Sequence, residues 1–222
     1  MKKNNIGGTF VVIEGMDGIG KTTLAVKLKE DLIKQGYKEE DIVITREPYS
    51  KEIKKEIMDN DLSNYEEQKL FTKDRELHLK EVVKPALKEG KIVICDRYIL
   101  SSIVYQKVKD GLDAKTILNM SKNCLRPDYQ IVLTAISPKS IIDRLYKNNR
   151  EEMNKYDYQK MDFHEKINQT YMELKDNKIY DTQVAEKSIG VNYSNMKVED
   201  MSKYILKNLE IKKIDKIEGG IE

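Results

Sequence analysis

The sequence predicts an α/β fold in three layers, with a central parallel sheet of five strands flanked by helices. Two observations lead to this prediction. Short apolar runs rich in valine and isoleucine alternate along the chain with segments whose apolar residues recur every three or four positions. A glycine-rich segment, residues 15–20, also stands directly between the first such run and the first helical segment. Strands that alternate with helices form βαβ units, and these units place their strands parallel.

The first strand is predicted over residues 9–14, where an apolar run continues up to Glu14. The first helix is predicted to begin at Lys21. Leucines recur there at the spacing of one helical face, at Leu24, Leu28 and Leu32. Gly36 follows as the expected C-terminal cap of this helix.

Four further strands are expected over residues 41–45, 91–95, 129–134 and 188–192. A long helix is predicted over residues 65–88, with Pro85 kinking or breaking it near its end. Another helix starts at Ser137-Pro138, where a capping residue precedes a proline at the first helical position. A closing helix is expected over residues 198–209.

The segment after the first strand has the pattern G-x-x-x-x-G-K-T of a P-loop. The backbone N–H groups of such a loop converge on phosphate, and the following helix adds the positive end of its dipole. Lys21 is expected to reach the β- and γ-phosphates, and the Thr22 hydroxyl to bind Mg²⁺. The residues expected around the phosphates of ATP are Gly15, Gly18, Gly20, Lys21, Thr22 and Thr23. The alternative is a glycine-rich turn that only joins a strand to a helix.

Composition limits the other classes of function. The 40 lysines and arginines exceed the 38 aspartates and glutamates by a net charge of only +2, so we expect no nucleic-acid partner. We expect no membrane association, since no apolar run is long enough to span a bilayer. Cys95 and Cys124 are interpreted as reduced thiols of a cytoplasmic protein. The length suits a single domain, which we assign to residues 1–222.

Four segments together resemble the thymidylate kinase family. They are residues 13–23, Thr45-Arg46-Glu47-Pro48, residues 70–78 and the segment from Asp96-Arg97-Tyr98 to Gln106. The resemblance covers about residues 8–210. It implies a P-loop NTPase fold and an enzyme that transfers the γ-phosphate of ATP to dTMP, giving dTDP and ADP. It also implies Mg²⁺ as a cofactor and a homodimer formed through helices such as that over residues 65–88.

A monophosphate acceptor brings a dianionic phosphate next to an already anionic triphosphate. Arginines neutralise such charge with fork-shaped donors, and the candidates are Arg46, Arg75 and Arg97. Phe71 lies one turn before Arg75, so one helix can stack a base on Phe71 while Arg75 meets the phosphate. The resemblance implies these roles. From the residues alone, a core aromatic at Phe71 and a solvated charge at Arg75 remain open.

Two aspartates stand where the phosphates are expected. A carboxylate at Asp17 costs electrostatic energy unless it pairs with another group. We expect it to hold an arginine or to meet the acceptor's sugar hydroxyl and Mg²⁺-bound water; capping the helix is the alternative. Asp96 ends a strand beside the loop, where it is expected to ligate Mg²⁺ with Thr22 or to orient Arg97. The expected catalytic set comprises Lys21, Arg97, Asp17 and an arginine from a lid.

By the same resemblance, Ser102 lies at the thymine edge and Tyr105 crowds the 2′ side of the sugar, which disfavours ribose. The family often has a larger polar residue at the position of Ser102. Bacterial relatives usually continue Pro48 with Gly-Gly-Thr, whereas this chain has Tyr49. We expect Tyr49 to narrow or reshape the acceptor phosphate pocket.

Residues 144–160 are polar and basic and look like the lid of bacterial-type thymidylate kinases. Phosphoryl transfer needs positive charge over the moving group, and the variable P-loop positions 16–19 carry none. Arg150 is therefore the preferred lid arginine, with Arg144 and Lys147 behind it. Lys155 stands near the place of a common family arginine but lacks its planar fork. A solvated charged segment is the alternative.

Two segments have no expected function: residues 177–187, interpreted as an insertion, and a frayed tail over residues 212–222. Other functions also remain compatible with the sequence. A broader deoxynucleoside monophosphate kinase would use the same arginines. A deoxynucleoside kinase, whose acceptor has no phosphate, would have little use for them. A non-catalytic ATP-binding switch would need no Arg150.

Overall fold

The computed structural model describes residues 1–148, 161–176, 178–179 and 182–211. Its central sheet has five parallel strands in the order β2-β3-β1-β4-β7. The strands are β1 (Thr9–Glu14), β2 (Ile42–Arg46), β3 (Ile92–Asp96), β4 (Tyr129–Thr134) and β7 (Lys187–Asn192). The predicted parallel sheet is confirmed, and every strand lies within one residue of its expected bounds.

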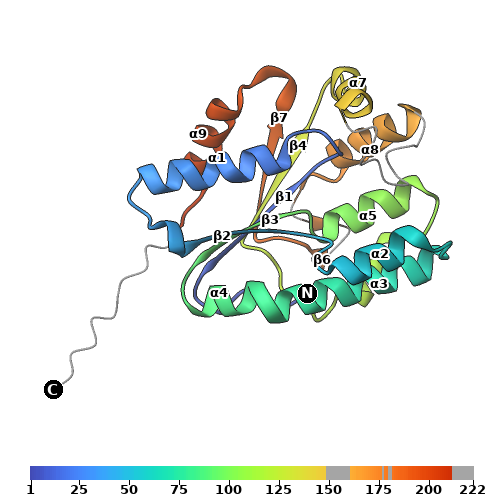
Figure 1. Ribbon diagram of the computed structural model, residues 1–222, viewed down its shortest axis with the longest axis horizontal. Helices are drawn as coiled ribbons and strands as arrows, with labels where there is room; N and C mark the ends of the chain where they lie inside the picture. Colours follow the sequence, from blue (N-terminus) through green and yellow to red (C-terminus); the bar gives the residue numbers. More distant parts are fainter. Residues whose placement is uncertain (149–160, 177, 180–181, 212–222) are drawn as a thin grey trace.

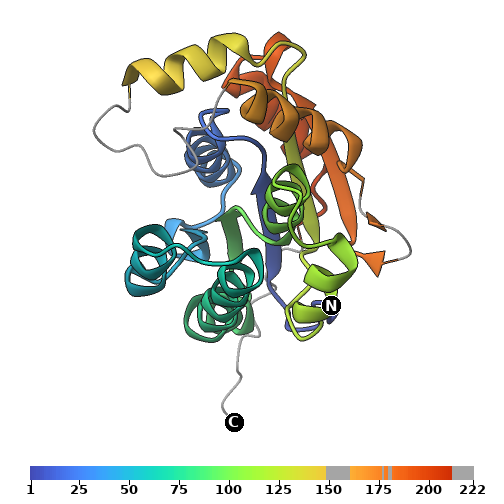
Figure 2. The ribbon, with the colours of Figure 1, turned by 90° about the vertical axis from the view of Figure 1, so that its right-hand side faces the viewer.

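Helices cover both faces of this sheet, as predicted (Figure 1). On one face, α1 (Lys21–Lys34) packs against α9 (Val198–Asn208). On the other face, α4 (Lys84–Lys88) contacts β3, α8 (Met161–Glu173) contacts β4, and α5 (Ile99–Val108) packs on α8. The view at right angles shows the strands passing between these helices (Figure 2).

The remaining elements are shorter or belong to the long helical segment before β3. They are η1 (Glu39–Asp41), α2 (Lys51–Asp59), α3 (Asn64–His78), the π-helical η2 (Leu79–Val83), α6 (Ala114–Met120), α7 (Lys139–Asn148), β5 (Lys178–Ile179), β6 (Thr182–Gln183) and η3 (Tyr193–Asn195). The helix predicted over residues 65–88 is therefore α3, η2 and α4 in succession. The expected interruption near Pro85 takes the form of the π-helical segment before it.

Two expectations lie outside the described residues: the tail over residues 212–222 and most of the lid, residues 149–160. The segment interpreted as an insertion contains the antiparallel pair β5–β6, which the sequence analysis did not predict. Within the described ranges, no helix is long and apolar enough to cross a membrane.

The core forms around β1, whose six residues are all buried. Leu24, Leu28 and Leu32 are buried beneath α1, which confirms the predicted helical face. Cys95 and Cys124 are buried free thiols. Because the strands are parallel, their carboxyl ends meet at one edge, and β1, β2 and β3 end there with Glu14, Arg46 and Asp96.

Candidate active site

The glycine-rich loop joins the end of β1 to the start of α1. Gly15 has a φ of 149°, and a Cβ atom there would lie 2.8 Å from the Leu133 carbonyl oxygen, so only glycine fits. Lys21 is the first residue of α1, and its Nζ donates to the Met16 carbonyl oxygen at 2.9 Å. Burial, followed by the Arg97 charge, lowers the pKa of Lys21 to about 8. The loop thus places a buried lysine at a helix N-terminus, where anions bind.

Oxygen ligands suited to Mg²⁺ lie next to this loop. The Thr22 hydroxyl donates to Asp96 Oδ2 at 2.7 Å. Within the described part of the chain, Asp96 Oδ1 is buried and has no hydrogen-bond partner. A hydroxyl and a carboxylate are hard oxygen donors of the kind that Mg²⁺ takes beside nucleotide phosphates. These residues fit the metal that the sequence analysis assigned to them.

Asp17 and Arg97 form an ion pair between the P-loop and the end of β3. Tyr105 from α5 joins them, because its hydroxyl donates to Asp17 Oδ2 at 2.5 Å and lies 3.2 Å from Arg97 Nη2. Burial alone would raise the pKa of Asp17, but Arg97 and Lys21 outweigh it and hold this pKa well below its ordinary value. Burial raises the pKa of Tyr105 well above its usual range. The trio is therefore a carboxylate, a guanidinium and a protonated phenol.

A buried carboxylate, Glu14, supports Arg97 from behind. Arg97 has a φ of 74°, a left-handed conformation that costs energy for a side chain other than glycine. Glu14 accepts hydrogen bonds from the Tyr98 backbone N–H at 2.9 Å and from the Ser101 hydroxyl at 2.5 Å. Ser101 in turn accepts from Arg97 Nη1 at 3.1 Å. Burial raises the pKa of Glu14, against the opposing effects of Ser101 and Arg97.

A pocket opens beside these groups, between β2, α2, α3 and α5. Its lining includes all the residues predicted on the acceptor side: Asp17, Arg46, Phe71, Arg75, Arg97, Ser102 and Tyr105. Arg46 is exposed at the end of β2, whereas Phe71 is half-buried on α3. The structure thus gathers residues from four separate segments of the sequence into one cavity.

Arg75 lies deeper than its neighbours, with 2% of its surface exposed. Its Nε donates to Glu47 Oε2 at 2.8 Å, and its Nη2 donates to the Ser102 hydroxyl at 3.2 Å. Although burial alone would lower its pKa, the charge of Glu47 raises the pKa of Arg75 above its ordinary value. Arg75 is therefore a buried, paired cation, which excludes the solvated surface charge left open by the sequence.

The family model described as thymidylate kinase matches residues 13–195. The chain belongs to the thymidylate kinase family. It is 38% identical over 176 residues to the thymidylate kinase of Caldicellulosiruptor saccharolyticus, covering 75% of this chain and 82% of that protein. It is 37% identical over 177 residues to the probable thymidylate kinase of Pyrococcus abyssi, with the same coverage of 75% and 82%.

A solved structure supports the fold of this thymidylate kinase family member. The thymidylate kinase from Ehrlichia chaffeensis matches with a TM-score of 0.67 and 24% identity, over 92% of this chain and 99% of that one. The fold is therefore that of a P-loop NTPase, and the chain is a phosphotransferase. The family generally uses ATP and Mg²⁺.

Tyr49, which the sequence analysis expected to narrow or reshape the acceptor phosphate pocket, does not line that pocket in the described structure. Its ring stacks on His78, with centroids 5.0 Å apart and an interplanar angle of 20°. Its hydroxyl donates to Glu81 at 3.1 Å. The Tyr49 side chain therefore contacts His78 and Glu81, which do not line the pocket, and any effect of Tyr49 on the pocket passes through these neighbours.

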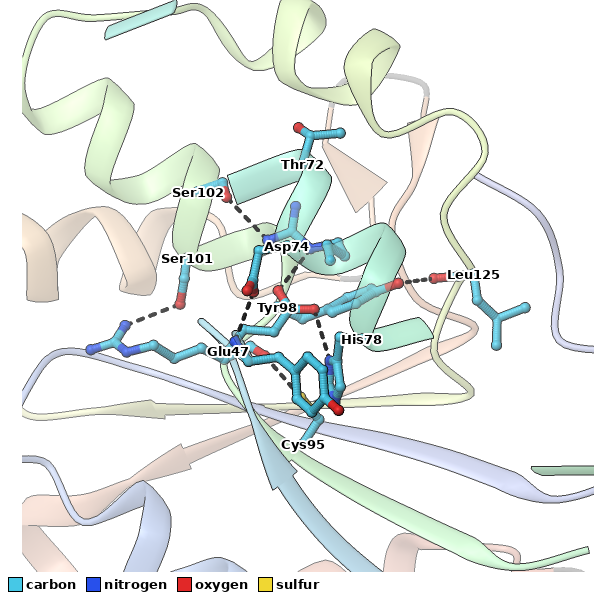
Figure 3. A network of polar contacts seen from close by, with 12 residues as sticks. Glu47, Thr72, Asp74, His78, Cys95, Tyr98, Ser101, Ser102 and Leu125 are labelled. Carbon is cyan, nitrogen blue, oxygen red and sulfur yellow. Dashed lines mark hydrogen bonds and ion pairs between the residues drawn. The ribbon is translucent and has the colours of Figure 1, made fainter. Parts of the chain in front are cut away.

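Three buried residues escaped the sequence analysis as site residues: Glu14, Glu47 and His78. Figure 3 shows Glu47, Asp74 and His78 close together. All three missed residues stand within the family segments, and Glu47 directly follows a predicted site arginine. The sequence therefore offered their place in these segments as a signal and, for Glu47, its adjacency to Arg46 as well. Arg150 and Lys155 lie outside the described residues, as do the side chains of Arg144 and Lys147.

Proposed function

We propose that this thymidylate kinase family member transfers the γ-phosphate of ATP to dTMP, giving dTDP and ADP. The observation that carries the proposal is the Asp17–Arg97 pair, which joins the P-loop directly to a pocket lined by arginines. A donor phosphate held at Lys21 and an acceptor phosphate held at Arg97 would therefore be neighbours. Because phosphoryl transfer depends mainly on such positioning, no covalent enzyme intermediate is required.

On the donor side, Gly15, Gly18, Gly20 and Thr23 would surround the phosphates, while Lys21 reaches the β- and γ-oxygens. Thr22 and Asp96 would hold Mg²⁺, which neutralises phosphate charge when it is bound. Asp17 keeps Arg97 oriented toward the acceptor. Arg150 would close with the lid, stabilise charge in the transition state and exclude water.

On the acceptor side, Arg46 and Arg97 would bind the phosphate. Phe71 would stack on the base, and Tyr105 would lie against the sugar. The hydroxyl of Tyr105 is already bound to Asp17 and Arg97, so the ring is fixed in place. A fixed ring excludes a ribose 2′-hydroxyl by its volume. These contacts account for a deoxyribonucleotide acceptor.

For Arg75 we propose a role different from the expected phosphate contact. Glu47 already neutralises its charge, and its Nη2 touches Ser102, the residue expected at the thymine edge. Arg75 Nη1 is buried and has no hydrogen-bond partner among the described residues. A neutral acceptor fits this donor better than a dianion beside Glu47 does. Arg75 would therefore donate to a carbonyl oxygen of the base, with Ser102 beside it.

We infer a single domain over residues 1–222 that forms a homodimer through the α3–η2–α4 segment. We infer a cytoplasmic location, which the two free buried thiols support.

The decisive test is the release of ADP from ATP·Mg²⁺ with dTMP, dUMP, dCMP, dGMP, dAMP, UMP or thymidine as the acceptor. The proposal predicts strong turnover of dTMP, little of UMP and none of thymidine. Comparable turnover of several deoxynucleoside monophosphates would instead favour the broader kinase, which the short Ser102 side chain makes the second candidate. If the wild-type protein bound ATP but phosphorylated none of these acceptors, the proposal would be contradicted and a non-catalytic switch favoured.

A further inference from the structure

A buried chain of polar groups runs behind the acceptor pocket and ends on Arg75. His78 Nε2 lies 2.8 Å from the Thr45 hydroxyl. His78 Nδ1 lies 3.3 Å from Glu47 Oε1 (Figure 3). The other carboxylate oxygen of Glu47 accepts the Arg75 Nε hydrogen bond. His78 has no exposed surface and Glu47 only 4%. None of the roles proposed for dTMP transfer uses Thr45 or His78.

The surroundings hold His78 in a single orientation. The Tyr49 ring covers one face of the imidazole as a stacked partner. One turn earlier on α3, the Asp74 carboxylate accepts the backbone N–H groups of Tyr49 at 2.8 Å and Ser50 at 2.7 Å. The loop between β2 and α2 is therefore hydrogen-bonded to α3 at three residues, Glu47, Tyr49 and Ser50.

These hydrogen bonds between the loop and α3 fix the plane of the Arg75 guanidinium. Two of the three guanidinium nitrogens have fixed hydrogen-bond directions, because Nε donates to Glu47 and Nη2 donates to Ser102. A planar guanidinium with two fixed directions has its third nitrogen, Nη1, fixed as well. Arg75 lines the pocket, and Nη1 is its buried nitrogen without a partner in the described structure. Since a guanidinium can only donate, Nη1 requires an acceptor atom from a ligand.

We propose that Glu47 and His78 are positioning residues that set the base selectivity of this enzyme. By holding Arg75 in one orientation, they let Nη1 bond a base that carries a carbonyl oxygen at that position. A base with an amino group there would place two donors against each other and leave both unpaired. If Arg75 were free to turn away, this penalty would fall. The inference rests on the proposed function, and it adds a mechanism for choosing the acceptor.

The test compares dUMP with dCMP, because uracil carries a carbonyl oxygen where cytosine carries an amino group. The neighbouring ring nitrogen also differs, as a donor in uracil and an acceptor in cytosine, but this difference is the same in every variant, so a change in the ratio reports on Arg75. We would measure kcat/KM for each at saturating ATP·Mg²⁺ in the wild type, Glu47→Gln and His78→Phe. Phenylalanine keeps a ring for Tyr49 to stack on but removes both hydrogen bonds. We expect the dUMP-to-dCMP ratio to fall at least tenfold in each variant, with the KM for ATP unchanged.

Glu81→Gln is the matched control, since Glu81 is exposed and contacts only the outer hydroxyl of Tyr49 in the hydrogen bonds described. We expect its ratio to stay within twofold of the wild type. A folded Glu47→Gln or His78→Phe that slows both acceptors equally would overturn the inference. Should those variants fail to fold, Thr45→Val removes one hydroxyl at the far end of the chain, and an unchanged ratio there would overturn it. A wild type inactive on every monophosphate would overturn the proposed function instead.

Discussion

At the scale of single residues, the site is built from charges that the protein itself pairs. Asp17 holds Arg97, Glu47 holds Arg75, and Glu14 supports Arg97 through Ser101. A buried charge without a partner costs several kcal/mol, so the buried Arg75 and the mostly buried Arg97 need carboxylates while the site is empty, whereas the exposed Arg46 is solvated. The pairs also limit the orientations of the guanidinium groups before a substrate arrives. Such preorganisation is the main means of catalysis in phosphoryl transfer.

Lys21 gives a prediction about pH at this scale. Its folded pKa of about 8 lies below the model-peptide value of 10.5. Above pH 8 the free enzyme loses the charge that binds phosphate, so we expect kcat/KM for ATP to decline there, and this parameter reports the free enzyme. The folding linkage has the opposite sign. Between pH 8 and 10.5 the unfolded chain holds the extra proton, so the ligand-free protein gains stability as the pH rises.

The measurement is kcat/KM for ATP at saturating dTMP between about pH 6.5 and 9.5, with unfolding of the ligand-free enzyme followed over the same range. A flat kcat/KM profile through pH 9.5 would contradict the assigned role of Lys21.

At the scale of elements, the long and strongly patterned segments could be predicted from the sequence. The strands β1, β3 and β4 are nearly continuous buried runs, and α1 repeats leucine on one face, so burial alone determines these elements. The edge strands β2 and β7 are only partly buried and have weaker apolar patterns. The short helices α2, α5 and α6 were not predicted. In α2, only Ile53 and Ile57 are buried, and the other residues are mostly charged. Three apolar residues in nine, of which only Ile53 and Ile57 share a buried face, are too weak a period to separate a helix from a loop.

Part of the candidate site could also be predicted from the sequence. Residues that meet a ligand stand at strand ends in family segments, and all those expected on the acceptor side line one pocket. Glu14, Glu47 and His78 act through contacts between segments distant in sequence, such as the 87 positions between Glu14 and Ser101. In a chain with 35% charged residues, a single carboxylate gives no sign that it is buried.

The helix that carries Phe71 and Arg75 gives a prediction about stability. Ser63 caps α3 in a capping box, because its hydroxyl accepts from the Glu66 N–H and Glu66 accepts from the Ser63 N–H. We expect Ser63→Ala to lower the free energy of unfolding by about 1 kcal/mol and Tm by about 2–4 °C. Ser63 is exposed, so kcat/KM for dTMP should not change.

Denaturant unfolding and a dTMP titration would check this expectation. The exposed Ser140 in α7 provides a matched Ser→Ala control without a cap, and its variant should stay within about 0.5 kcal/mol of the wild type. An equal loss in both variants would mean that the capping box contributes nothing specific to α3.

At the scale of the whole molecule, the acceptor pocket joins parts of the chain that are otherwise separate. Arg46 comes from β2, Phe71 and Arg75 from α3, Ser102 and Tyr105 from α5, and Asp17 from the P-loop. A nucleotide that touches all four segments binds the folded chain and not the unfolded one. Such a ligand stabilises the fold by mass action, to an extent set by its concentration relative to its Kd.

We therefore expect dTMP at about 100 times its Kd to add about 2.7 kcal/mol of stability and to raise Tm by about 5–10 °C. Thymidine at the same concentration should give a clearly smaller shift, because it fills the base and sugar sites but leaves Arg46 and Arg97 without a phosphate. Differential scanning fluorimetry of the wild type and Arg97→Ala would separate the two contributions. In Arg97→Ala the difference between dTMP and thymidine should shrink, while the thymidine shift itself remains. Equal shifts for both ligands in the wild type would show that the arginines do not bind the acceptor phosphate, even if the base occupies the pocket as proposed.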